Sequence, residues 1–182
     1  MKDLEQTFNQ YFNCKPLSEL PSIPKQYSYF PDNKMNGQDG LIIEVEPQNG
    51  LPWIGIFSFG DFENGKTGIF SHPDPNSVCV ISKGRGYIVK ANNPSQWMEI
   101  SAYPIFDAIS IRKHNSLIIA TNSGLIAYDD KGLKWKTDRL TLDDLKICGL
   151  TEDAVTVEGS GLRKESVKFK IEFELGRVFQ LS

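Results

Sequence analysis

From Gly40 onward the chain is a series of short apolar runs, rich in Ile, Val, Phe and Tyr, which Gly, Asn, Asp and Pro residues interrupt. Such runs between turn residues are typical of β-strands and are too short for most helices. We expect strands at about residues 77–81, 86–90, 97–102 and 106–112, and then at 116–120, 125–129, 133–137 and 142–148. The pattern predicts an all-β body of antiparallel strands.

Four of these runs are evenly spaced along the chain. The runs Gly40 to Ile43, Val78 to Ile81, Ser116 to Ile119 and Ala154 to Val157 begin at intervals of 38 residues. The same offset places Trp97 on Trp135. Four short antiparallel strands in such a unit is the content of one propeller blade, so we expect repeated four-stranded units in a propeller-like array. A β-sandwich or a curved meander is the alternative.

One unit carries a more detailed pattern. Residues 116–135 contain a strand, a Gly turn, a second strand, an Asp-x-Gly turn and then a Trp. This order resembles a blade of the quinoprotein-type propellers. The resemblance implies the blade fold and no quinone, and we expect no cofactor.

The N-terminal part has a different texture. Apolar side chains occur at helical spacing, at Leu4, Phe8, Tyr11 and Phe12, after a potential N-cap at Asp3. This spacing predicts one short helix within residues 1–14. Residues 15–40 are rich in proline and predict an extended segment that lies against the β body of residues 41–182. We expect residues 1–182 to form a single domain.

Composition narrows the function classes. The chain has 20 Lys and Arg residues against 23 Asp and Glu residues, which argues against dedicated binding to nucleic acid or to an anionic membrane. Neither a signal peptide nor a membrane-spanning run is evident, so we expect a cytoplasmic protein. The three cysteines, Cys14, Cys79 and Cys148, are expected to be reduced, with Cys79 and Cys148 in the core.

One motif points to nucleotide chemistry. Gly60, Gly65, Lys66 and Thr67 match the phosphate-binding loop pattern G-x-x-x-x-G-K-T. Such a loop opens directly into a helix, whereas here Pro73 and Pro75 follow closely. Asp61 and Glu63 would also turn negative charge toward a polyphosphate. We therefore interpret Asn64-Gly65 as a type I′ hairpin turn and keep nucleotide binding as an alternative.

Other catalytic chemistry has little support in the sequence. The two histidines, His72 and His114, have no Cys, Asp or Glu at zinc-ligand spacing, and each is expected on a surface loop. The adjacent pairs Asp129-Asp130 and Asp143-Asp144 are expected in turns or on the surface. We predict no metal site and no catalytic residues.

The C-terminal section resembles a group of small bacterial proteins of unassigned activity. These proteins share a W-x-T-x-R-L and D-x-L-x-I pattern, which is present here at Trp135 to Leu140 and at Asp143 to Ile147. A later strand and glycine follow, in residues 169–176. Small β-rich bacterial proteins of this kind are similar in outline to the immunity proteins of toxin–antitoxin and contact-dependent growth inhibition systems. Such immunity proteins neutralise a toxin by binding it.

We therefore predict a non-enzymatic protein-binding protein, monomeric alone, that occludes a basic toxin domain. The expected partner-binding residues are mostly acidic and lie in loops. They are Asp61, Phe62, Glu63, Asp74, Asp129 and Asp130. The alternatives are a nucleotide-binding enzyme that uses residues 60–67 and a structural subunit of a larger assembly.

Overall fold

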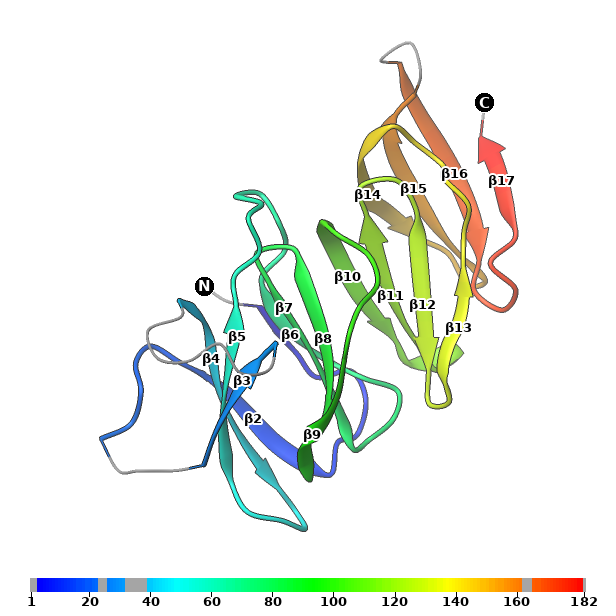
Figure 1. The fold of residues 1–182 in the computed structure, drawn as a ribbon. Helices are drawn as coiled ribbons and strands as arrows, with labels where there is room; N and C mark the ends of the chain where they lie inside the picture. Colours follow the sequence, from blue (N-terminus) through cyan, green and yellow to red (C-terminus); the bar gives the residue numbers. More distant parts are fainter. Residues whose placement is uncertain (1–2, 23–25, 32–38, 162–164, 182) are drawn as a thin grey trace.

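The computed structural model describes residues 3–22, 26–31, 39–161 and 165–181, and it is all-β apart from one short 3-10 helix, η1 (Arg112–His114). The strands form four sheets (Figure 1). Sheet 1 has the order β2 (Phe12–Leu17), β4 (Gly40–Pro47), β5 (Trp53–Ser58) and β3 (Gln26–Phe30). Sheet 2 has the order β1 (Asp3–Glu5), β6 (Gly68–Ser71), β7 (Ser77–Ser82), β8 (Arg85–Lys90) and β9 (Asn93–Glu99).

Sheets 3 and 4 are simple antiparallel meanders. Sheet 3 consists of β10 (Ile105–Ile111), β11 (Ser116–Thr121), β12 (Leu125–Asp129) and β13 (Gly132–Lys136). Sheet 4 consists of β14 (Asp143–Leu150), β15 (Ala154–Ser160), β16 (Ser166–Glu172) and β17 (Val178–Leu181). The expected strands of the two central units are confirmed to within a few residues, because each apolar run pairs with its neighbour in the chain.

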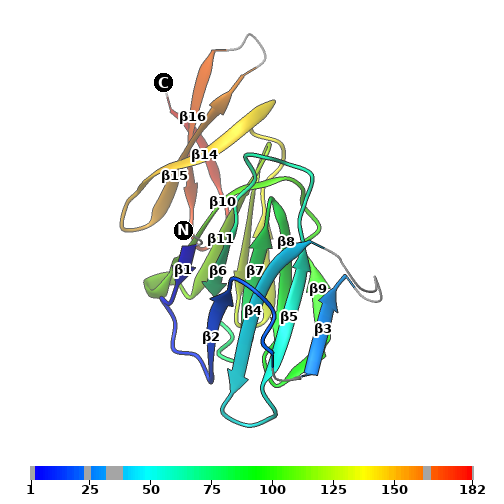
Figure 2. The same ribbon diagram turned by 90° about the vertical axis from the view of Figure 1, so that its left-hand side faces the viewer.

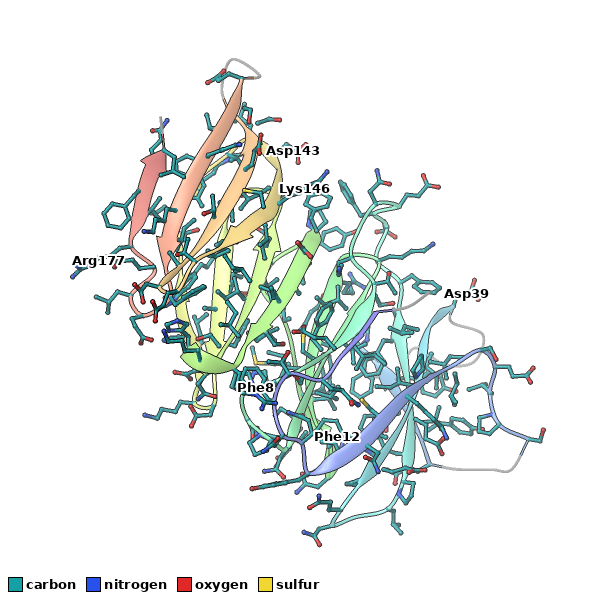
Figure 3. The ribbon with its side chains drawn as sticks, turned by 180° about the vertical axis from the view of Figure 1, so that it is seen from behind. Phe8, Phe12, Asp39, Asp143, Lys146 and Arg177 are labelled. Carbon is teal, nitrogen blue, oxygen red and sulfur yellow. The ribbon has the colours of Figure 1, made fainter. Side chains whose placement is uncertain are left out.

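The four sheets stack face to face in one open row, as successive blades of a propeller do (Figure 1). Each neighbouring pair of sheets shares one buried apolar cluster, so sheet 1 packs on sheet 2, sheet 2 on sheet 3, and sheet 3 on sheet 4. Sheets 1 and 4 lie at opposite ends of the row, which Phe12 on β2 and Arg177 before β17 mark in Figure 3. Among the described residues no apolar cluster joins these two sheets. The propeller-like array is therefore open.

The 38-residue spacing holds between sheets 3 and 4 but not between sheets 2 and 3. Leu117 of β11 faces sheet 2, and Val155 of β15, which lies 38 positions later, faces sheet 3. Cys79 of β7 faces sheet 3, whereas Leu117, also 38 positions later, faces back toward sheet 2. Because side chains alternate between the two faces of a strand, the structural offset between β7 and β11 must be odd. The cross-strand pairs give this offset as 39 residues, because the pair Val80 and Tyr87 of sheet 2 corresponds to the pair Ile119 and Ile126 of sheet 3.

Sheet 1 departs further from the repeat. Its strand β3 pairs in parallel with β5 and takes the place that β9, β13 and β17 occupy in the other sheets. Strand β4 runs opposite to β2 and β5, which point up in Figure 2. Trp53, at the start of β5, contacts Ala91 directly after β8, and Phe57, near the end of β5, contacts Ser82 in front of β8. Strand β5 is therefore antiparallel to β8, its counterpart in sheet 2. The evenly spaced run at Gly40 is therefore not equivalent to the other three.

The predicted N-terminal helix is wrong. Residues 3–5 form β1, which adds in parallel to the edge of β6, and residues 12–17 form β2. Phe12 is buried while Tyr11 is exposed, as expected in an extended chain, and Figure 3 shows Phe8 and Phe12 along this segment. A helix of this length is marginal on its own. Pairing with the open edges of β6 and β4 provides the backbone hydrogen bonds instead.

Indole rings join two of the three sheet interfaces. Trp53 of sheet 1 donates its Nε1–H to the carbonyl oxygen of Ala91 in sheet 2, at 2.7 Å. Trp135 of sheet 3 donates to the carbonyl oxygen of Phe173 in sheet 4, also at 2.7 Å. Trp97, the expected counterpart of Trp135, faces sheet 1 instead and packs edge-on against Phe30. The odd offset between sheets 2 and 3 explains this difference.

Candidate functional site

The six residues predicted to bind a partner lie at two opposite ends of the strands. Asp61, Phe62 and Glu63 lie in the loop between β5 and β6, at the upper end in Figure 1. Asp74 follows β6, and Asp129 and Asp130 end β12, at the lower end of the strands. The structure therefore provides two separate candidate regions rather than one acidic surface.

The loop of residues 59–67 does not have the architecture of a phosphate-binding loop. It leads from β5 of sheet 1 into β6 of sheet 2, where the motif requires a helix. The Lys66 ammonium lies 3.4 Å from the Asp107 carboxylate and 5.8 Å from the centre of the Phe70 ring. The predicted hairpin turn is also wrong, because β5 and β6 belong to different sheets and neither Asn64 nor Gly65 has a positive φ.

Instead, Phe62 of this loop forms an aromatic cluster with Tyr103 and Phe106. The Phe62 ring packs edge-on against Phe106 at 5.6 Å and against Tyr103 at 6.2 Å. Phe62 is 41% exposed and Tyr103 is 44% exposed. The Tyr103 hydroxyl accepts a 2.7 Å hydrogen bond from the Asp61 backbone N–H. The cluster is thus fixed in position, and exposed Asp61 and Glu63 flank it.

The second region is a cavity of about 340 Å³ between sheets 2 and 3. Its apolar wall includes Ile88, Met98 and Tyr128, and its polar wall includes His72 and Lys90. Of the predicted residues, Asp74 and Asp130 line it. The cavity has the size and the mixed lining of a small-molecule or side-chain pocket.

His72 is buried at 4% exposure, so its expected position on a surface loop is wrong. Its Nδ1 accepts a 3.0 Å hydrogen bond from the Asp74 backbone N–H, which places the proton of the neutral ring on Nε2. That buried Nε2–H has no hydrogen-bond partner among the described residues. Burial lowers the pKa of the His72 imidazole to about 4, so the ring is neutral at pH 7.

Asp74 is held by a local network beside His72. Burial alone would raise the pKa of its carboxyl, but hydrogen bonds from Lys90 and Ser77 outweigh burial and lower that pKa. The Ser77 hydroxyl donates at 2.6 Å, and the Lys90 ammonium forms an ion pair with the same carboxylate oxygen. This carboxylate is engaged within the protein, which makes it a weak candidate for contact with a partner.

The two remaining acidic residues also have structural contacts. The Asp129 carboxylate accepts hydrogen bonds from the backbone N–H groups of Lys131 and Gly132, at 2.8 and 3.1 Å. The Asp130 carboxylate accepts one from the Asn115 side chain, at 2.8 Å. These contacts are those of a turn, as the sequence indicated for this pair.

His114 and Cys148 differ from expectation in smaller ways. His114 is half-buried, and its ring packs on Phe173 of sheet 4 with centroids 4.4 Å apart. Cys148 is exposed rather than in the core, because a register shift in β14 after Ile147 displaces it. In the described part of the chain, no three His, Cys, Asp or Glu side chains come together as metal ligands. Nor does that part contain a helix long and apolar enough to cross a membrane.

Sequence reasoning missed Tyr103, Phe106, Met98 and Tyr128 as members of these two regions. Tyr103 and Phe106 are 41 and 44 positions from Phe62, and only the tertiary packing of the chain brings them together. Met98 and Tyr128 line the same cavity from sheets 2 and 3. No local signal in the sequence could have identified either pair.

Comparisons with known proteins find similarity at the level of structure only. No protein-family model matches the sequence, and a search of curated proteins found no match. The chain is similar to the N-terminal domain of Nup159, with a TM-score of 0.44 and 14% identity over 100% of this chain and 53% of that one. It is similar to BamB from Moraxella catarrhalis, with a TM-score of 0.44 and 14% identity over 81% of this chain and 50% of that one. The chain spans about half the length of these structures.

A third structure is more distant. The WD40 domain of Toxoplasma gondii coronin has a TM-score of 0.38 and 8% identity, over 98% of this chain and 66% of that one.

Proposed function

We propose that this chain is a non-enzymatic binding protein whose partner is another protein, and more specifically a bacterial immunity protein that occludes a basic toxin domain. The supporting observation is the aromatic cluster that Phe62 of the loop of residues 59–67 forms with Tyr103 and Phe106. Exposed aromatic side chains held in one conformation are typical anchors of protein interfaces, because they bury a large area at a small entropic cost. Phe62 and Tyr103 have both properties.

The charge around the cluster supports a basic partner. Asp61 and Glu63 are exposed on either side of Phe62, whereas Asp74 and Asp129 are occupied by internal contacts. Carboxylates at the rim of an interface mainly accelerate association with a positively charged partner, and dissolved salt screens this effect. Of the predicted partner-binding residues, we therefore retain Asp61, Phe62 and Glu63 as the proposed surface.

We expect the double variant Asp61→Lys, Glu63→Lys to lower the association rate with a basic toxin domain by about tenfold at low salt. The difference should shrink as salt is added, and the free energy of unfolding should change by less than about 0.5 kcal/mol. The measurement is association kinetics, at several salt concentrations, with any basic toxin domain found encoded beside the gene for this chain. Glu46→Lys, an exposed carboxylate on sheet 1, is the matched control and should change neither quantity.

The variant Phe62→Ala tests the aromatic anchor separately. We expect it to weaken binding by about 2 kcal/mol, or roughly 30-fold, mainly through faster dissociation. Tight toxin binding that neither Phe62→Ala nor the charge reversal changes would move the interface elsewhere. Failure of the wild-type chain to bind the toxin domain or to protect cells that express it would refute the immunity function.

A further inference from the structure

The cavity between sheets 2 and 3 lies where the next interface holds an indole ring. In sheet 3, Trp135 pairs across β12 and β13 with Ala127, and both side chains face sheet 4. In sheet 2, Met98 pairs across β8 and β9 with Ile88, whose side chain faces sheet 3. Met98 is therefore the positional counterpart of Trp135. It is 46% exposed, and it lines the cavity together with Ile88.

The receiving side of the cavity matches the Trp135 site as well. The pair Ile119 and Ile126 of sheet 3 corresponds to the pair Val157 and Phe169 of sheet 4. Asp130 follows Ile126 by as many positions as Phe173 follows Phe169, so Asp130 is the counterpart of Phe173. The Phe173 carbonyl oxygen accepts the Trp135 N–H. Asp130 lines the cavity, in the corresponding turn of sheet 3.

A glycine with a positive φ lies beside each of the two sites. Gly176, with φ at +64°, lies so close to the indole of Trp135 that an added Cβ would approach the ring to 2.8 Å. Gly132, the first residue of β13, also has a positive φ, +123°, but an added Cβ would have no neighbour within 4 Å. Gly132 lines the cavity.

From this correspondence we propose that the cavity between sheets 2 and 3 is a binding site for an indole ring supplied from outside the chain. Ile88, Met98 and Tyr128 provide apolar contact with the ring, and the turn of Asp130 to Gly132 provides the hydrogen-bond acceptor for its N–H. The buried Nε2–H of His72 is a further polar group that a ligand with an acceptor would satisfy. A volume of about 340 Å³ suits a ligand of this size.

The site is distinct from the proposed toxin-binding loop, since the two lie at opposite ends of the strands. The ring has two natural sources, a free indole compound or a tryptophan side chain in a polypeptide. The recognition chemistry is the same for both, so the experiment compares the two sources directly.

The test is titration of the full chain with indole and with N-acetyl-tryptophanamide, followed by calorimetry and by amide chemical shifts. We expect saturable binding with shifts centred on Lys131, Gly132 and Met98. The probe that binds more tightly identifies the source. Removal of the N–H donor in 1-methylindole should weaken binding by roughly three- to tenfold.

Met98→Trp supplies the ring from within and should reproduce the filled interface of sheets 3 and 4. We expect it to weaken indole binding at least tenfold and to raise the melting temperature. Leu51→Trp, at an exposed position that does not line the cavity, controls for the added indole and should bind indole as the wild type does.

Absence of saturable shifts at the cavity residues in the wild-type protein would overturn the proposal, whatever the stability of the variants. Equal indole affinity in Met98→Trp and the wild type would overturn it as well, because the ring would then bind elsewhere. Neither result depends on the toxin-binding measurements, which use residues 61–63.

Discussion

Substitution of Trp53 or of Trp135 by Ala is expected to lower the free energy of unfolding by about 3–5 kcal/mol in each case. Both indoles are almost fully buried between neighbouring sheets, and each donates a hydrogen bond to a carbonyl oxygen of the next sheet. Truncation removes the apolar contact, leaves a cavity and leaves that carbonyl oxygen without its partner. Denaturant unfolding of each variant measures the loss.

Phe variants separate the two contributions. Trp53→Phe and Trp135→Phe keep an aromatic ring in the interface but remove the N–H donor, so we expect smaller losses of about 1–3 kcal/mol. Trp97→Ala is the third comparison, and it should cost less than Trp135→Ala because Trp97 is only half-buried. Losses below about 1 kcal/mol for both Trp53→Ala and Trp135→Ala would contradict the view that the indoles join the sheets.

Acidification through the titration range of His72 is expected to remove about 3 kcal/mol of stability. Burial lowers the pKa of this imidazole from 6.5 to about 4, so between these values the unfolded chain binds a proton that the folded chain does not. The contribution is therefore fully present above about pH 6.5, declines as the pH falls toward 4, and is constant below that. Urea unfolding at several pH values measures the slope, which should reach about 1.4 kcal/mol per pH unit.

The variant His72→Gln cannot titrate and should lose this slope even if its stability at pH 7 is lower. A further loss of stability in more acidic solution should persist in the variant, because Asp74 and Glu174 have lowered pKa values. An NMR titration that found the wild-type His72 ring half-protonated near pH 6.5 would contradict the buried, neutral state.

Strand positions were predictable because they depend on local pattern. The apolar runs at 77–81, 116–120 and 125–129 are short and continuous and end at turn residues, and these strands form at the predicted places. The N-terminal segment was not predictable in this way. Its helical spacing is overridden by the open edges of β6 and β4, which the segment can only meet in three dimensions.

The candidate regions depended even more on the tertiary structure. The sequence singled out Asp61, Phe62 and Glu63, and the structure places them beside Tyr103 and Phe106, from a different part of the chain. The cavity could not be predicted, because it depends on Met98 occupying in sheet 2 the position that Trp135 occupies in sheet 3. The spacing of 38 residues paired Trp135 with Trp97 instead, one residue away on the opposite face of β9.

By itself the sequence determined the fold class, the strands of the two central units and the repeated four-stranded content, because a short apolar run between turn residues is a local property of each strand. Only the tertiary structure decided which face of each sheet meets which neighbour, the reversed course of sheet 1, the open end of the row and the burial of His72. The physical reason is that successive side chains of a strand point to opposite faces of the sheet. A register difference of one residue therefore turns each side chain toward the other neighbouring sheet without changing the local sequence pattern.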